Sequence, residues 1–180
     1  MRIALIADTF PPLRSSGAVQ IRDLSREFAR QGHSLCVLLP APEQTEPWRL
    51  EEHAGAQIMR LKAPKSKDVG YVRRTLAEMA MPFAMLRNLR KSPLAHERWD
   101  ALLWYSPSIF HGPLVSALKK KSACRSYLII RDIFPEWALD MGLMGRGLPY
   151  RFFAAVARYQ YALADVIGVQ SPGNLRYFAS

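Results

Sequence analysis

Short apolar runs alternate with amphipathic segments along the chain, a pattern typical of strands that alternate with helices. The runs predict strands at residues 3–7, 35–39, 57–61, 101–105, 126–130 and 166–169. Most of them are continuously apolar, as in strands covered by helices on both faces. The polar, proline-containing stretch 41–52 is predicted to be a loop between the second and third strands.

Apolar residues at helical spacing follow several of these runs. They predict a helix around Ile21, Leu24 and Phe28 that ends at Gly32, and further helices at 71–91, 109–121 and 150–164. Pro82 predicts that the helix at 71–91 is kinked or split. The alternation of elements predicts the α/β class, with a doubly wound parallel sheet.

A helix-start signal, Ser171 followed by Pro172, lies close to the last residue, Ser180. We therefore expect residues 1–180 to form one domain and the natural protein to continue into a second one. A length of 180 residues with 49% hydrophobic and 22% charged residues suits one globular domain or half of a two-domain enzyme.

Charge narrows the possible partners. The chain has 25 Lys and Arg against 15 Asp and Glu, a net charge of +10. This excess favours an anionic partner, which can be nucleic acid, an acidic membrane surface or a phosphorylated small molecule.

Residues 101–118 contain no Asp, Glu, Lys or Arg and have the length of a short membrane span. Pro107, Gly112 and Pro113 favour a buried strand, a turn and a helix instead. The five apolar residues before Asp8 are too few for a signal peptide, so we expect a cytoplasmic protein.

Two loops carry candidate chemistry, because ligands of open parallel sheets bind at the carboxyl ends of the strands. After the first strand come Asp8 and then Ser15, Ser16 and Gly17, which lead into a helix whose N-terminus can hold a phosphate or a sugar hydroxyl. Simple helix capping is the alternative for these small residues. The segment contains neither a GxGxxG nor a P-loop pattern.

The segment after the fifth strand has the strongest character of a site. Arg131, Asp132, Glu136 and Trp137 directly follow an apolar run. Either these side chains line a cleft, or Arg131 and Asp132 form a structural ion pair. The histidines are scattered, no HxH, HExxH or DxD pattern occurs, and two cysteines are too few for a cysteine zinc cage. We therefore expect neither a metal nor a cofactor.

Basic residues surround the apolar group 79–86. This arrangement predicts an amphipathic element that rests on an anionic bilayer. The expected membrane contacts are Arg73, Arg74, Phe83, Arg87, Arg90 and Lys91. Solvated helix faces explain the same charges, and nucleic-acid binding is a third interpretation, although the aromatic residues lack the placement of a known nucleic-acid module.

The first 40 residues, MRIALIADTFPPLRSSGAVQIRDLSREFARQGHSLCVLLP, resemble the start of family 4 retaining glycosyltransferases of the GT-B type. The segments IIRDIFPEWALDMG and ADVIGVQSPGNLRYFAS are similar to the subgroup that adds amino sugars such as N-acetylfucosamine during bacterial surface polysaccharide assembly. The resemblance implies two facing Rossmann-like domains, of which residues 1–180 are the N-terminal, acceptor-side one. The C-terminal nucleotide-sugar domain is absent from this sequence.

The resemblance also assigns roles to residues. Ser16 and Gly17 match the family's small-residue pair near the donor phosphates and the acceptor. Arg131 stands where many members have a histidine, so we expect it to hold a pyrophosphate rather than to act as a base. Asp132 and Glu136 are expected on sugar or acceptor hydroxyls, with Asp8 also in the substrate site.

The implied reaction is a retaining transfer from a nucleotide sugar to a polyprenyl-pyrophosphate-linked or other lipid-linked saccharide, in lipopolysaccharide, O-antigen or capsule biosynthesis. It would need no metal and take place on the cytoplasmic face of the inner membrane, with the protein bound peripherally. A GT-B-like nucleotide-sugar epimerase and a basic nucleic-acid-binding domain are the alternatives.

Overall fold

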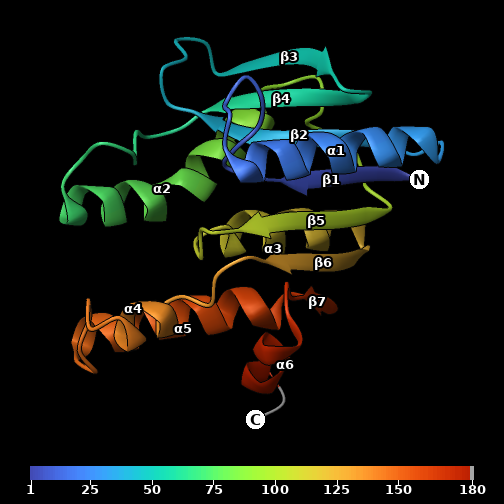
Figure 1. Cartoon of the computed structure of the whole chain (residues 1–180). Coiled ribbons are helices and arrows are strands. Elements are labelled where there is room, and N and C mark those ends of the chain that lie inside the picture. The colour runs from blue at the N-terminus through green and yellow to red at the C-terminus, as the bar shows by residue number, and fades with distance from the viewer. Residues whose placement is uncertain (179–180) are drawn as a thin grey trace.

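A seven-stranded sheet runs through residues 1–178, the part of the chain that this computed structural model describes (Figure 1). Its strands are β1 (Arg2–Ile6), β2 (Ser34–Ala41), β3 (Trp48–His53), β4 (Ala56–Lys62), β5 (Ala101–Ser106), β6 (Arg125–Ile130) and β7 (Val166–Gly168). They are ordered β3-β4-β2-β1-β5-β6-β7, and neighbours are parallel except for the antiparallel pair β3 and β4. The prediction of an α/β fold with a doubly wound parallel sheet is confirmed, with the edge strand β3 as the one antiparallel addition among the described residues.

The connecting helices are α1 (Ser16–Arg30), α2 (Tyr71–Leu89), α3 (Gly112–Ser122), α4 (Glu136–Asp140), α5 (Leu148–Ala162) and α6 (Pro172–Phe178). Gly32 follows the end of α1 with a φ of +75°, a conformation that glycine adopts without steric cost. Of the kink or split expected at Pro82, the split does not occur, because α2 continues through this residue. Burial of Met81, Pro82 and Met85 holds the C-terminal half of the helix against neighbouring residues, despite the hydrogen bond that Pro82 cannot donate, whereas residues 71–80 include no buried side chain.

Strand β3 lies in the stretch predicted to be a loop. Its sequence, WRLEEH, is polar because it forms the edge of the sheet. Trp48 and Leu50 still pack against the core, whereas Arg49 is exposed. The turn to β4 consists of Ala54 and Gly55, both with positive φ, as in a two-residue hairpin of type I′.

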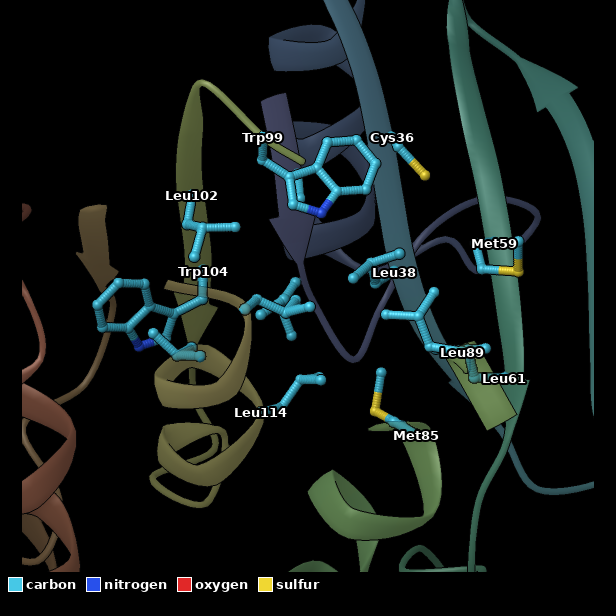
Figure 2. Close-up of a cluster of buried hydrophobic side chains, with 14 of the residues drawn as sticks. Cys36, Leu38, Met59, Leu61, Met85, Leu89, Trp99, Leu102, Trp104 and Leu114 are labelled. Carbon is cyan, nitrogen blue, oxygen red and sulfur yellow. The ribbon is translucent and has the colours of Figure 1, made fainter. Parts of the chain in front are cut away.

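Each face of the sheet has its own hydrophobic core. Ile3 and Leu5 of β1 face the cluster that includes Ile21 of α1, whereas Ala4 and Ile6 face the cluster that includes Met85 of α2. The second cluster is the larger, and Figure 2 shows side chains of α2 and α3 converging in it on those of the central strands. Helix α1 therefore covers one face of the sheet, and α2 and α3 cover the other.

The chain begins in the middle of the sheet, and successive strands are added first on the β2 side and then on the β5 side. Strands β1 and β5 are therefore the switch point, where ligands of doubly wound sheets bind. Their carboxyl ends lie on the left in Figure 1, the side toward which the start of α2 and the short α4 also extend.

Residues 101–118 form β5, a short loop and the first part of α3, as the sequence predicted. None of the helices in residues 1–178 is long and apolar enough to cross a lipid bilayer.

Candidate functional site

Tyr105 connects three loops at the switch point. It lies near the end of β5 and is only 2% exposed. Its hydroxyl accepts a hydrogen bond from Nη1 of Arg131 at 3.0 Å and donates one to Oε1 of Gln20 at 2.8 Å. The loop after β6, the end of β5 and the first turns of α1 are thereby tied together.

Gly17 completes this cluster through its lack of a side chain. A Cβ atom at this position would lie 3.0 Å from Cγ2 of Thr9 and 3.2 Å from the Tyr105 hydroxyl. Gly17 is buried at the start of α1, so the helix N-terminus approaches Tyr105 more closely than any other residue would allow. We call Gly17, Gln20, Tyr105 and Arg131 the switch-point cluster.

Two neighbouring serines, Ser15 and Ser16, have different environments. Ser15 is the N-cap of α1, and its side chain accepts from the Ala18 amide at 3.2 Å and bonds the Thr9 hydroxyl at 2.9 Å. Helix capping thus explains Ser15. Ser16 is the first helical residue and is exposed, which leaves its hydroxyl open to solvent.

Arg131 and Asp132 do not form the structural ion pair considered above. Arg131 is half-buried and bonds Tyr105, and this hydrogen bond is the main cause that raises the pKa of its guanidinium. Asp132 is exposed. The guanidinium has five N–H donors, so the bond to Tyr105 orients it and leaves donors for an anion.

Asp8 follows β1 and is half-buried, with one oxygen, Oδ1, buried and lacking a hydrogen-bond partner in the described chain. His111, at the start of α3, is fully buried, and neither of its ring nitrogens has a partner among residues 1–178. Burial lowers the pKa of His111, and the charge of Asp8 opposes this change. The two residues are therefore close enough to influence each other, and His111 is held neutral.

Glu136 does not join the switch-point cluster by any hydrogen bond. Its Oε1 accepts from the hydroxyls of Tyr150 at 3.2 Å and Tyr177 at 3.1 Å, which connects α4 to α5 and α6. Burial and the carboxylate raise the pKa of Tyr177 to about 12. Glu136 thus holds helices together, although its Oε2 is buried without a partner in the described residues.

The apolar residues exposed on α2 are only partly those of the group 79–86 that was expected to rest on a membrane. Within the group 79–86, Met81 and Met85 are buried against the core, so they are not available to a bilayer. The exposed apolar residues are instead Val72, Leu76, Met79 and Phe83, which we call the α2 stripe. Their spacing of four, three and four residues places them on one face of the helix.

The six predicted membrane contacts are all exposed. Phe83 belongs to the stripe, and Arg87, Arg90 and Lys91 follow it at the end of the helix. Arg74 is different, because its Nε is paired with Oε1 of Glu78 at 2.8 Å and it lies on another face.

Among residues 1–178, no group of three or more His, Cys, Asp or Glu side chains is placed to hold a metal ion. Tyr105, Gln20 and His111 were not identified from the sequence. Tyr105 ends an apolar run like any core residue, and its hydrogen bonds join positions 85 and 26 residues apart.

Solved structures of glycosyltransferase-like proteins share this fold. Sucrose-phosphate synthase from Thermosynechococcus elongatus matches 99% of the chain with a TM-score of 0.67 and 13% identity, over 44% of its own length. A protein described as trehalose-6-phosphate from E. coli, bound with UDP-2-fluoro glucose, matches 99% of the chain with a TM-score of 0.65 and 12% identity, over 42% of its length. TcCGT1 in complex with UDP matches 98% with a TM-score of 0.59 and 12% identity, over 45% of its length.

At such identities these similarities establish the fold alone, and the chain spans less than half the length of each of the three proteins. No curated protein sequence matches the chain significantly. Residues 17–180, by contrast, match the family described as glycosyl transferase 4-like domain. The chain therefore belongs to this glycosyltransferase family and has the fold of the N-terminal half of a GT-B enzyme.

Proposed function

We propose that the chain is the acceptor-side half of a retaining glycosyltransferase that moves a sugar from a nucleotide sugar to a lipid-linked saccharide, in the assembly of a bacterial surface polysaccharide. The observation that carries this proposal is the switch-point cluster. It brings a helix N-terminus at Gly17 and a cation at Arg131 to one hydroxyl, that of Tyr105.

This arrangement suits the chemistry of the leaving group. When the bond between sugar and diphosphate breaks, negative charge grows on the diphosphate. The positive end of α1 and the guanidinium of Arg131 stabilise that charge. Because Tyr105 fixes Arg131 in advance, little reorganisation is needed during the reaction. Asp132 lies beside Arg131 and is exposed, as a residue that contacts sugar hydroxyls would be.

The donor is proposed to be bound mainly by a second, facing domain, since the chain covers less than half of each structurally similar protein. UDP or a UDP-sugar analogue occupies two of those proteins. Ser16 and Gly17 would then face the donor phosphates across the interdomain cleft.

The membrane role rests on the α2 stripe. Leu76 is 61% and Phe83 59% exposed. Exposure of these apolar side chains to water is unfavourable, and their burial in a bilayer interface would remove this free-energy cost. Arg87, Arg90 and Lys91 beside the stripe complement anionic headgroups. We infer peripheral binding to the cytoplasmic face of the inner membrane, where a polyprenyl-linked acceptor resides.

A transfer assay tests the proposed reaction. The complete gene product is incubated with UDP-, GDP- and TDP-sugars and a short-chain lipid pyrophosphate saccharide, and the anomeric configuration of the product is determined by NMR. The proposal expects transfer with retention, undiminished by EDTA. Epimerisation or hydrolysis of the nucleotide sugar without transfer, or inversion at the anomeric carbon, would contradict it.

A further inference from the structure

Helix α5 exposes a second line of apolar side chains. Leu148 is 79%, Phe152 40% and Tyr159 45% exposed, and Ala155 is exposed between them. Their spacing of four, three and four residues is the same as in the α2 stripe and places them on one face of the helix. Ala157 lies on the opposite face and is buried in a core cluster. Helix α5 is therefore amphipathic, with an apolar line on the side that faces solvent.

The end of α4 and the loop after it carry further exposed apolar side chains. Trp137 is 42% exposed, and Met141 and Leu143 are each 69% exposed. Single exposed apolar residues are common, whereas a group of them marks a surface that binds another molecule. We define the α5 surface as Trp137, Met141, Leu143, Leu148, Phe152 and Tyr159.

The charges around the α5 surface favour an anionic partner. Helix α5 contains no Asp or Glu. Residues 137–159 include three arginines, at 146, 151 and 158, all of them exposed, against the single carboxylate of Asp140. Apolar side chains flanked by arginines complement the acyl boundary and the headgroups of an anionic bilayer.

Helix α5 also belongs to the same layer of helices as α2. Met85 of α2, Leu114 of α3 and Tyr161 of α5 pack into one core cluster, on the face of the sheet opposite α1. Nζ of Lys119, in α3, donates to the carbonyl of Leu163 directly after α5 at 2.9 Å. In Figure 1, α2 and the pair α4 and α5 extend together beyond the carboxyl ends of the strands, on the left. One flat partner can therefore contact the outer sides of both helices.

A facing second domain would leave this side of α5 free. Such a domain lies over the carboxyl ends of the strands, where ligands of doubly wound sheets bind. The line of Leu148 and Phe152 instead lies on the side of α5 away from the core, opposite the buried Ala157.

We propose that the α5 surface inserts into the interface of the same anionic bilayer as the α2 stripe, and that both contacts are needed to hold the domain there. A single helix would leave the domain free to rotate about the helix axis, whereas two contacts fix its orientation. Helix α2 packs near β4 and α5 connects β6 to β7, so the switch point at β1 and β5 lies between the contacts. This inference rests on the proposed membrane role and adds to it a second surface.

The first test is co-sedimentation of the 180-residue chain with vesicles of phosphatidylglycerol and phosphatidylethanolamine in equal parts. Leu148→Ser removes an exposed apolar side chain of the α5 surface and should weaken binding at least about fivefold. Val19→Ser is the matched control, because Val19 is an exposed apolar residue of α1, on the other face of the sheet, and binding should be unchanged. Thermal unfolding shows whether both variants are folded.

A pair of double variants separates the local charge from the net charge. Arg146→Glu with Arg151→Glu should weaken vesicle binding at least about tenfold. Arg26→Glu with Arg30→Glu lowers the net charge equally but changes exposed arginines of α1, and should weaken binding less than about threefold.

Trp137 reports insertion directly. Trp99 and Trp104 are buried and Trp48 lies half-buried on the edge strand, so quenching by lipids with brominated acyl chains reports mainly on Trp137. We expect such vesicles to quench part of the tryptophan emission, and Trp137→Phe to remove the quenched part.

Unaltered sedimentation of the Leu148→Ser and Arg146→Glu/Arg151→Glu variants, or no quenching of Trp137, would overturn the proposal. If Phe83→Ala still lowers sedimentation in that case, the membrane role of the α2 stripe stands without the α5 surface. Unaltered sedimentation of Phe83→Ala as well would refute the membrane role itself. A lipid-free dimer that Leu148→Ser converts to monomers in sedimentation velocity would assign the α5 surface to a second copy of the chain and also overturn the proposal.

Discussion

Nη1 of Arg131 donates to the hydroxyl of Tyr105 at 3.0 Å, and this bond joins the loop after β6 to the strand that pairs with β1. Tyr105 is buried, so the guanidinium is anchored to a part of the core and not to a flexible surface group. The orientation of the candidate anion-binding residue is thus decided by a residue that need not touch substrate.

Tyr105→Phe should lower the catalytic activity more than it lowers the stability of the fold. The variant keeps the ring but removes the acceptor for Arg131 and the donor to Gln20. Because Arg131 then lacks its fixed orientation, we expect a roughly ten- to hundredfold decrease in kcat/KM for the donor. Steady-state kinetics on the complete gene product measure this decrease. Unaltered kinetics with a lower free energy of unfolding would show that Tyr105 is only structural.

Gly17→Ala should destabilise the chain by about 1–3 kcal/mol, because the new methyl group would approach Thr9 and Tyr105 to 3.0–3.2 Å. Gly145→Ala is the matched control, since no atom lies within 4 Å of a Cβ at that position. Urea denaturation measures both free energies of unfolding. Equal values for the two variants would contradict the close approach of α1 to β5.

Phe83 and Met85 lie two residues apart on α2 with opposite environments. Met85→Ala removes a fully buried side chain and should cost about 2–5 kcal/mol of stability. Phe83→Ala, at a site 59% exposed, should change stability by less than about 0.5 kcal/mol but reduce co-sedimentation with anionic vesicles.

Charge reversal separates membrane binding from nucleic-acid binding. Changing Arg87, Arg90 and Lys91 to Glu should abolish binding to anionic vesicles, because these exposed cations follow the α2 stripe. Vesicle binding that persists in this variant, or salt-sensitive binding of DNA in place of vesicles, would contradict the membrane interpretation.

His111 predicts a dependence of stability on pH. Burial lowers its pKa below the ordinary value of 6.5, so the unfolded chain binds more protons than the folded chain below that pH. The free energy of unfolding should therefore fall as the pH drops below about 6.5, by up to about 1.4 kcal/mol per pH unit from this residue. His111→Leu should lose correspondingly less stability between about pH 7.5 and about pH 5.5, as urea denaturation at the two pH values would measure. Equal losses would indicate that His111 is accessible to protons in the folded chain.

The continuous apolar strands and the helix end at Gly32 could be predicted from the sequence, because local composition and backbone conformation decide them. Strand β3 was not, since an edge strand is stabilised by pairing with β4 and keeps a polar sequence. Its signals were Trp48 and Leu50 on alternate positions and the glycine at 55.

For the candidate site, the sequence predicts which loops carry it but not how their side chains contact one another. Arg131 and Gly17 follow strands that end at the same edge, which the sequence pattern indicates. The hydroxyl that joins them belongs to Tyr105, and the partners of a buried side chain depend on tertiary packing. For the same reason the sequence did not show which apolar residues of α2 are buried, such as Met85, and which are exposed, such as Phe83.

The most direct test of the switch-point cluster as the site of glycosyl transfer compares two arginines of one strand and its loop. Arg131→Ala removes the guanidinium held by Tyr105, whereas Arg125→Ala removes an exposed one at the opposite end of β6. Initial rates of transfer are measured with the complete gene product. We expect Arg131→Ala to lower kcat/KM at least about a hundredfold, because it removes a group that stabilises developing charge. The Arg125→Ala variant should keep the kcat/KM of the unaltered protein. Equal activity of the two variants would contradict the account.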